Sequence, residues 1–159
     1  MSSGLPSLGR RGEGWVIAQF VLGAAILVLG IVGFAWPDGV SRALTFVGVL
    51  VGAFGMVLLA QGFGALGSSL TPFPRPLENA ALREGGVYGR VRHPIYGGVL
   101  LLALGWSLAL SPLALAATVL LWVLLELKSR HEESMLLARY PEYRTYRERV
   151  RRRFVPGVY

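Results

Sequence analysis

Two long uncharged apolar runs constrain the fold of this chain more than any other feature. The first covers residues 15–36 and the second covers residues 43–66, and neither contains a formally charged residue. A helix needs ~20 predominantly apolar residues to cross a bilayer, so each run is long enough. The first run also exceeds the ~7–15 residues of a signal-peptide core, so we expect it to remain as an uncleaved span. The sequence therefore predicts an integral membrane protein.

Two shorter apolar runs follow, residues 95–110 and 113–126, separated by Ser111 and Pro112. Proline is favoured in the first turn of a helix, so this spacing predicts an antiparallel helical hairpin over residues 95–127. A helix of about 16 residues reaches only about 24 Å, less than the ~30 Å hydrocarbon core. We therefore expect a short hairpin that either spans a locally thin part of the bilayer or lies within the helix bundle beside a water-filled polar site.

The distribution of basic residues predicts the orientation of the spans. Of the 16 Lys and Arg residues, all except Arg42 lie before residue 15, between residues 64 and 92, or after residue 127. Alternating spans place these three regions on one side of the membrane, which the positive-inside rule assigns to the cytoplasm. Both termini are therefore expected in the cytoplasm. The basic tail is expected to face anionic lipid headgroups and not nucleic acid, through Arg144, Arg147, Arg149, Arg151, Arg152 and Arg153.

The predicted architecture is a single all-α membrane domain over residues 1–159, with about four transmembrane helices. Residues 67–94 are too polar and too rich in proline and glycine for a span, so they form a cytoplasmic loop. Residues 128–159 form a cytoplasmic tail that begins as an amphipathic continuation of the last helix. Gly48 and Gly52 give the second span a small-residue face that can pack on another helix within one chain or between two.

The sequence argues against a nucleotide-binding fold and against a metal centre. A Gly-x-Gly-x-x-Gly pattern at Gly62, Gly64 and Gly67 ends an apolar helix and has no βαβ context, so it does not predict a dinucleotide site. The chain has no cysteine, which excludes disulfides, thiolate nucleophiles and cysteine metal ligands. Its two histidines, His93 and His131, are not spaced i, i+4, so no metal or haem site is predicted.

Two polar clusters flank the predicted hairpin. Arg92 and His93 precede its first arm, and residues 130–133, Arg-His-Glu-Glu, follow its second arm. Folding of the hairpin returns both clusters to one side of the membrane, so we expect them to face one pocket. Adjacent carboxylates there can pair with Arg92 or with an ammonium group of a ligand. On the residues alone, an interfacial anchor of Arg and Tyr side chains is an equally good interpretation.

These clusters belong to an ordered series of motifs: Gly86-x-Tyr88, Arg92-His93-Pro94-x-Tyr96-x-Gly98, Glu132-Glu133, Tyr143-x-x-Tyr146 and Pro156. The series resembles the isoprenylcysteine carboxyl methyltransferase family, in its bacterial integral membrane branch, which is related to phospholipid methyltransferases. The segment Thr71-Pro72-Phe73-Pro74 is similar to a loop of that branch. The resemblance covers about residues 70–156, and the ordered combination is more specific than any single motif.

The resemblance implies a methyltransferase that takes S-adenosyl-L-methionine from the cytosol and a lipophilic acceptor from the bilayer. It also implies that the hairpin forms the cofactor cavity together with the C-terminal tail, residues 128–159, which completes the site. It implies a cofactor site lined by Leu82, Arg83, Tyr88, Arg92, His93, Pro94, Ile95, Tyr96, Glu132 and Glu133. Arg130 is the nearest match to the family's substrate arginine, so Arg130, Glu133 and His93 are the catalytic candidates. Glu133 or His93 would remove the proton of an amine acceptor. The ring face of Tyr88 or Tyr96 would favour the sulfonium group.

The apolar spans do not encode the acceptor, so three functions stay open. The preferred prediction is methylation of an isoprenylcysteine-like carboxylate, and the second is methylation of a phospholipid amine. The third is a small non-catalytic membrane scaffold in which His93 and Glu133 only anchor the hairpin. A bacterial inner membrane is the expected location. In an enzyme of this kind the methyl group is already activated, so the protein mainly aligns it with the acceptor and excludes water.

Overall fold

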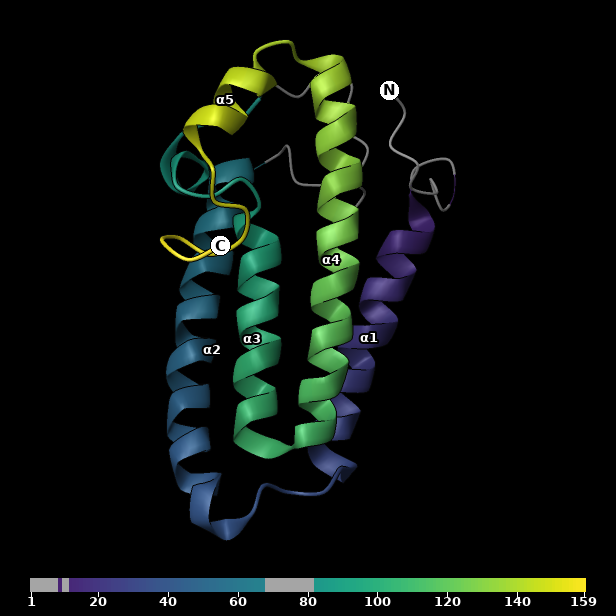
Figure 1. Cartoon of the computed structure of the whole chain (residues 1–159), viewed down its shortest axis with the longest axis vertical. Coiled ribbons are helices and arrows are strands. Elements are labelled where there is room, and N and C mark those ends of the chain that lie inside the picture. Colours follow the sequence, from purple (N-terminus) through teal and green to yellow (C-terminus); the bar gives the residue numbers. More distant parts are fainter. Residues whose placement is uncertain (1–8, 10–11, 68–81) are drawn as a thin grey trace.

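The computed structural model describes residues 9, 12–67 and 82–159, and these residues form helices and no strand. Four long helices run along the long axis of the molecule (Figure 1): α1 (Glu13–Val32), α2 (Asp38–Leu66), α3 (Pro94–Leu110) and α4 (Pro112–Arg139). A short 3-10 helix, η2 (Gly86–Gly89), precedes α3, and α5 (Tyr143–Arg149) follows α4. The prediction of an all-α fold is confirmed over the described residues. The segment Thr71-Pro72-Phe73-Pro74 lies outside them.

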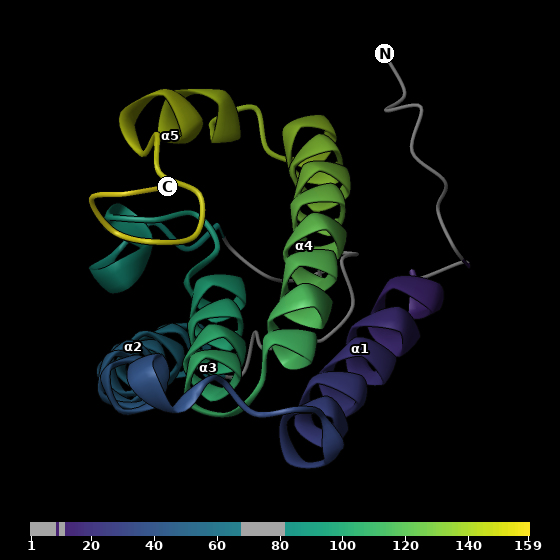
Figure 2. The same ribbon diagram turned by 60° about the horizontal axis from the view of Figure 1, so that its bottom comes forward.

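The ends of the helices gather the polar segments on one side. Figure 1 shows the α1–α2 and α3–α4 connections at one end of the molecule, and α5 with the C-terminal segment at the other. We call this second end, formed by η2, α5 and residues 150–159, the polar end. Helix α1 also begins near it. Figure 2 shows α5 and the C-terminal segment lying beyond the start of α3 and beside the last turns of α4.

Three of the described helices, α1, α2 and α4, are long and apolar enough to cross a membrane, whereas α3 is shorter, with 17 residues. Their outward faces carry large exposed apolar side chains, among them Phe20, Ile31 and Phe46. Contiguous apolar surface of this extent is unfavourable in water and is covered by the acyl chains of a bilayer. The chain is an integral membrane protein.

The helix ends differ from the predicted spans. Helix α1 ends at Val32, because residues 33–36 leave the helix and the indole of Trp36 donates to the carbonyl oxygen of Ser107 at 3.1 Å. Helix α2 begins at Asp38, directly after Pro37, whose φ of −54° suits the entry to a helix. Helix α4 has 28 residues and continues to Arg139, which agrees with the expected amphipathic continuation of the last helix, while α3 remains short.

The α3–α4 hairpin turns at Ser111 and Pro112, as predicted. The Ser111 hydroxyl oxygen accepts a hydrogen bond from the backbone N–H of Leu113 at 3.2 Å, which caps α4. Between the arms, the hydroxyls of Ser107 and Thr118 form a buried hydrogen bond at 2.8 Å. The arms are therefore antiparallel, and the start of α3 lies beside the polar part of α4.

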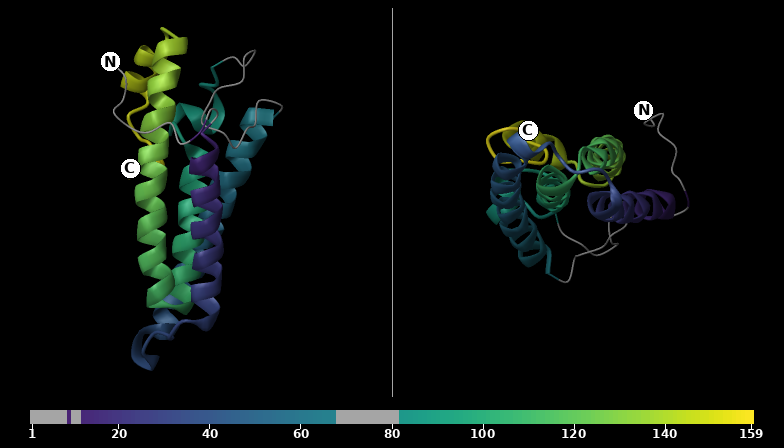
Figure 3. Two further views of the ribbon diagram at one scale, coloured as in Figure 1. Left: turned by 90° about the vertical axis from the view of Figure 1, so that its right-hand side faces the viewer. Right: turned by 90° about the horizontal axis from the view of Figure 1, so that it is seen from below.

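Helices α2 and α3 lie side by side (Figure 3), and glycines allow their backbones to come into contact. Gly48, Gly55 and Gly62 recur every seven residues on α2 and face α3. A Cβ added to Gly55 would lie 2.8 Å from the Cβ of Leu101, and one added to Gly105 would lie 2.5 Å from the carbonyl oxygen of Gly48. Such distances leave no room for a side chain, so part of the predicted small-residue face serves packing within the chain.

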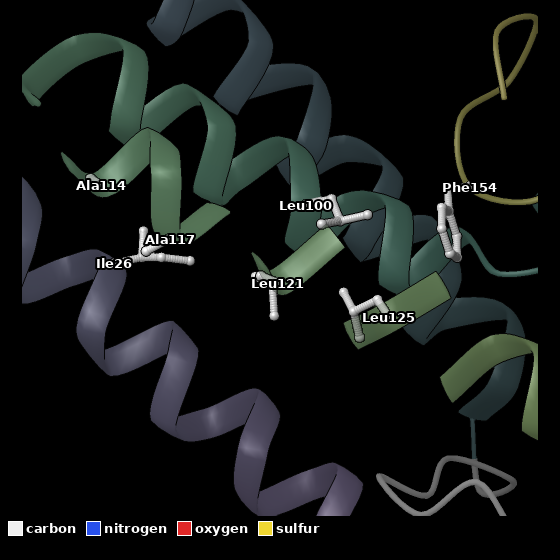
Figure 4. Packing of buried hydrophobic residues seen from close by; sticks show 7 residues of the cluster. All are labelled: Ile26, Leu100, Ala114, Ala117, Leu121, Leu125 and Phe154. Atoms are coloured by element: carbon white, nitrogen blue, oxygen red, sulfur yellow. The ribbon is translucent and has the colours of Figure 1, made fainter. Parts of the chain in front are cut away.

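A cluster of buried apolar side chains joins α1 and the hairpin to the C-terminal segment: Ile26, Leu100, Ala114, Ala117, Leu121, Leu125 and Phe154 (Figure 4). Phe154 lies at the edge of this cluster nearest the polar end, and it is almost completely buried. Burying a phenylalanine side chain contributes roughly 1.5–3 kcal/mol. The C-terminal segment is thus held against the hairpin by its own apolar anchor.

Candidate functional site

The start of α3 and the polar part of α4 meet at the polar end. Pro94 occupies the first turn of α3, so Arg92 and His93 stand just outside the helix and reach α4. Arg92 Nε donates to Glu133 Oε1 at 2.8 Å, and His93 Nε2 lies 3.1 Å from the same oxygen. Arg92, His93 and Glu133 are all buried. The two clusters that flank the hairpin in sequence are therefore in direct contact.

Tyr96 and Glu132 form a second pair beside the first. The hydroxyl of Tyr96 donates to Glu132 Oε2 at 2.8 Å. The ring of Tyr96 stacks on that of His93, with centroids 5.3 Å apart and planes 2° from parallel. The side chain of Glu132 is 25% exposed, whereas that of Glu133 is 4% exposed. Glu132 is therefore the carboxylate of the site that a ligand can reach.

Arg92 also fixes the C-terminal segment over the site. Its Nη1 donates to the carbonyl oxygens of Val150 at 2.6 Å and Arg151 at 2.8 Å. Its backbone N–H donates to the carbonyl oxygen of Arg152 at 3.1 Å. The planar guanidinium presents N–H donors in a fixed fork to these carbonyls and to Glu133 at the same time, a geometry that the single nitrogen of a lysine does not reproduce. The tail and the acidic pair are thus organised by one side chain.

Gly97 gives the tail its closest approach to α3. A Cβ at this position would overlap the carbonyl oxygen of Phe154. The aromatic ring of Phe154 meets those of His93 and Tyr96 edge-on, at centroid distances of 6.2 and 6.5 Å. The tail therefore supplies an aromatic wall to the site as well as backbone contacts.

Glu126 is the centre of a neighbouring polar group on α4. Its Oε1 accepts hydrogen bonds from Arg130 Nε at 2.8 Å and from Arg153 Nη1, and its Oε2 accepts one from the hydroxyl of Tyr159 at 3.1 Å. Arg130, the predicted substrate arginine, is 60% exposed and pairs here with Glu126. The second guanidinium near Glu133, after that of Arg92, belongs to Arg153, whose Nε lies 3.5 Å from Glu133 Oε1.

Arg153 was missed as a site residue, because it was expected to face lipid headgroups with the other basic residues of the tail. Three consecutive arginines give no periodic signal of which one turns inward. The apolar Phe154 directly after them was the available clue, since its burial draws Arg153 toward α4.

Tyr88 and Pro94, both predicted to line the cofactor site, are buried just before and at the start of α3. Tyr88 is buried in η2, where its carbonyl oxygen accepts a hydrogen bond from the hydroxyl of Tyr146 at 2.8 Å. Burial and, next, the charge of Glu132 raise the pKa of Tyr88, so its phenol stays protonated near that carboxylate. Burial likewise raises the pKa of Tyr146, which keeps its hydroxyl a donor. Pro94 is completely buried at the start of α3.

For three other predicted residues, the surroundings that the structure describes are other than Glu132 and Glu133. Ile95 packs against Gly62 of α2, where an added Cβ would lie 2.7 Å from Ile95 Cγ1. Leu82 packs against the buried side chains of α5 and Val150. Arg83 is exposed. Residues next to the Arg92-His93 motif in the sequence therefore do not all contact the same partners as the motif.

Lys128 and Gln19 connect α1 to the site and were not predicted. Lys128 is 1% exposed, and its Nζ donates to Gln19 Oε1 at 2.7 Å. The same ammonium lies 5.0 Å from the centroid of the Tyr96 ring. The ring of Tyr96, which was predicted to favour the sulfonium group of the cofactor, therefore already contacts the ammonium group of Lys128. The signal for Lys128 was its position in an apolar helix, where a charge is costly and usually functional.

These observations define a class: a polytopic membrane protein with a buried Arg-His-Glu centre and a reachable Tyr-Glu pair at one end of its helical bundle. The family comparison gives the chemistry of that class. The model of the phospholipid methyltransferase family matches residues 43–143, and the chain belongs to this family. The match contains His93, Tyr96, Glu132 and Glu133 and leaves out α1 and the tail. No curated protein and no solved structure matches the chain.

The family confirms the predicted relationship to integral membrane methyltransferases of the isoprenylcysteine carboxyl methyltransferase type. The chain is therefore a membrane methyltransferase by family.

Proposed function

We propose that this chain transfers a methyl group from S-adenosylmethionine to a phospholipid at the cytoplasmic face of the membrane. In a bacterium this membrane would be the inner membrane. The contact of Tyr96 and Glu132 with the buried Arg92-His93-Glu133 centre carries this proposal, because it places reachable polar groups at the boundary of an apolar bundle. The family description supports a phospholipid as acceptor. The basic residues of the loop and tail support a cytoplasmic polar end.

The chemistry of the site fits this cofactor. S-adenosylmethionine presents an ammonium group, ribose hydroxyls and an aromatic base. Glu132, whose side chain is partly exposed, offers a carboxylate to the ribose hydroxyls. When bound, the cofactor supplies a methyl group whose bond to sulfur breaks, with the electron pair staying on sulfur, as the acceptor bonds the carbon.

Glu132 and Glu133 have different tasks in this proposal. Glu133 faces Arg92, Arg153 and His93, so its charge is compensated and it orients His93. Glu132 is more exposed and accepts its hydrogen bond from the neutral hydroxyl of Tyr96. A carboxylate that is not neutralised by arginine is the better base, so Glu132 takes the proton of an amine acceptor.

A carboxylate acceptor, as in isoprenylcysteine, needs no base. The dependence of the methylation rate on Glu132 therefore separates the two acceptors. Analysis of lipids by mass spectrometry, after incubation with cofactor that carries a deuterated methyl group, identifies the product directly. We expect the added mass on the amine headgroup of a phospholipid.

Cofactor binding is the first test. We expect S-adenosylmethionine and its demethylated product to raise the melting temperature of the purified protein in detergent, because a ligand at 100 times its Kd stabilises the native state by about 2.7 kcal/mol. His93→Ala should reduce this shift. A wild-type protein that remains folded and shows no shift and no calorimetric binding with either compound would support the non-catalytic scaffold instead.

A further inference from the structure

Helices α1 and α4 carry facing polar side chains where they approach the polar end. Trp15 of α1 stacks on His131 of α4, with centroids 6.2 Å apart and planes 27° from parallel. One turn further into the bundle, Gln19 of α1 accepts the hydrogen bond of Lys128. We call these four residues the α1–α4 seam. Lys128 also contacts the ring of Tyr96, so the seam adjoins the site.

Two buried nitrogen atoms of the α1–α4 seam have no hydrogen-bond partner among the described residues: Trp15 Nε1 and His131 Nδ1. Trp15 is only 3% exposed. An unpaired buried polar atom costs free energy, and here two such atoms belong to rings that stack on each other. A ligand that pairs with both atoms would recover this energy.

Trp106 provides a comparison, because its unpaired indole nitrogen is packed against apolar groups. Its Nε1 is also buried without a partner. It lies directly against Gly30 of α1, because a Cβ added there would overlap the indole nitrogen. The indole of Trp106 therefore fills a gap against a helix backbone, whereas that of Trp15 lies beside an imidazole and near a buried ammonium.

The chemistry of the α1–α4 seam selects the ligand. The indole N–H of Trp15 donates, and His131 Nδ1 donates when it carries the ring proton, so a ligand that pairs with both atoms accepts hydrogen bonds, as an oxyanion does. On the outer face of α1, Ile17, Phe20 and Val21 are exposed and form an apolar strip next to the seam. An oxyanion attached to acyl chains satisfies both surfaces.

We propose that the α1–α4 seam binds the phosphodiester of the acceptor phospholipid, with its acyl chains along α1. The inference rests on the proposed function and assigns substrate selection to α1, which lies outside the family match. Lys128 contacts Tyr96, and Tyr96 bonds Glu132, so a phosphodiester held by the seam directs the rest of the headgroup toward Glu132.

The test is calorimetric binding of dihexanoyl phosphatidylethanolamine to the full chain in detergent. Trp15→Phe keeps the stacking on His131 and removes the donor, and His131→Phe removes the other unpaired nitrogen. We expect each to weaken binding of this phospholipid about 10-fold, because each removes one hydrogen bond to a charged group. Trp106→Phe, the matched control, should leave it unchanged. All three should bind the demethylated cofactor like wild type.

Two further probes identify the group that is bound. Dihexanoylglycerol, which lacks the phosphate, should bind wild type and Trp15→Phe equally. Inorganic phosphate alone should not compete with the phospholipid, and full competition would overturn the assignment to a lipid. If Trp15→Phe and His131→Phe bind the phospholipid like Trp106→Phe, the seam is an interfacial anchor and the inference is wrong. If wild type binds neither S-adenosylmethionine nor its demethylated product, the proposed function is refuted instead.

Discussion

Neighbouring residues in this site have different environments that the sequence does not distinguish. Glu132 and Glu133 are adjacent on α4, and successive helical side chains point about 100° apart. Glu133 consequently turns into the cations of Arg92 and Arg153, while Glu132 turns toward Tyr96. The sequence predicted that both would belong to the site. It could not assign their tasks, because these depend on which groups α3 and the tail bring to each carboxylate.

Glu133→Gln tests the structural task of the buried carboxylate. The substitution removes the charge that Arg92 and Arg153 face, and a broken buried ion pair costs about 3–5 kcal/mol. We expect a loss of about 3 kcal/mol or more in the free energy of unfolding in detergent. Glu148→Gln in α5, where the side chain is exposed, should change it by less than about 0.5 kcal/mol. Equal stabilities of the two variants would contradict a buried ionic centre.

Tyr96→Phe tests the orientation of Glu132. The variant keeps the ring that stacks on His93 and loses the hydroxyl that holds Glu132. Since one hydrogen bond contributes about 1.5 kcal/mol when its acceptor is charged, we expect kcat for methyl transfer to fall roughly 10-fold. The melting temperature should change little. A kcat equal to that of wild type would show that Tyr96 does not position the reactive carboxylate.

At the scale of elements, hydrophobicity predicted which segments are helices, but not where they end. Residues 33–36 are apolar and still leave α1, because Trp36 finds a hydrogen-bond acceptor on Ser107 of α3. The polar Asp38 and Arg42 nevertheless belong to α2, because Pro37 starts the helix. Such ends depend on tertiary partners and caps, which an apolar run does not contain.

The glycine contact between α2 and α3 is tested by Gly48→Ala. The added methyl group would lie 2.5 Å from the carbonyl oxygen of Gly105 and 3.0 Å from the backbone nitrogen of Ala109, so the helices must separate. We expect a loss of about 1–3 kcal/mol in unfolding free energy, the usual cost of overpacking. Gly64→Ala on the same helix has nothing within 4 Å of the new Cβ and should be neutral or slightly stabilising. If both variants unfold alike, close packing at Gly48 is not what holds α2 on α3.

Gly97→Ala tests the docking of the tail on α3. The methyl group would displace the Phe154 carbonyl and so weaken the hydrogen bonds from the backbone N–H groups of Arg92 and His93 to the tail. We expect hydrogen exchange at these two amides to become about 10-fold faster, which corresponds to 1.4 kcal/mol. Gly85→Ala, in open space before η2, is the control and should leave exchange unchanged. Unchanged exchange in Gly97→Ala would mean that the tail docks without this contact.

At the scale of the whole molecule, the site forms because a hairpin and a tail return to the same end. The sequence predicted the hairpin and thereby the meeting of His93 with Glu133, which are 40 residues apart. It did not predict Lys128, Arg153 or Phe154 as neighbours of the site. These residues arrive through the packing of α1 on α4 and through the docking of the tail, and neither contact has a periodic sequence signal.

Single cysteines test the orientation of the molecule, since the chain has none of its own. Asp38→Cys lies at the end with the helix connections and Thr145→Cys lies in α5 at the polar end, and both positions are exposed. In sealed right-side-out vesicles, an impermeant maleimide should label Asp38→Cys only. In inverted vesicles it should label Thr145→Cys only. The opposite pattern would place the polar end outside and contradict cofactor uptake from the cytosol.

Methyl transfer in proteoliposomes that contain an amine phospholipid and cofactor with a labelled methyl group tests the central claim most directly. We predict that wild type and Glu148→Gln label the lipid fraction, whereas Glu132→Gln labels it at a rate at least about 100-fold lower, the usual effect of losing a general base. Labelling by Glu132→Gln at the wild-type rate would contradict the claim that Glu132 of the polar end is the base for methyl transfer to an amine. Unlabelled lipid with folded, cofactor-binding wild type would contradict a phospholipid acceptor.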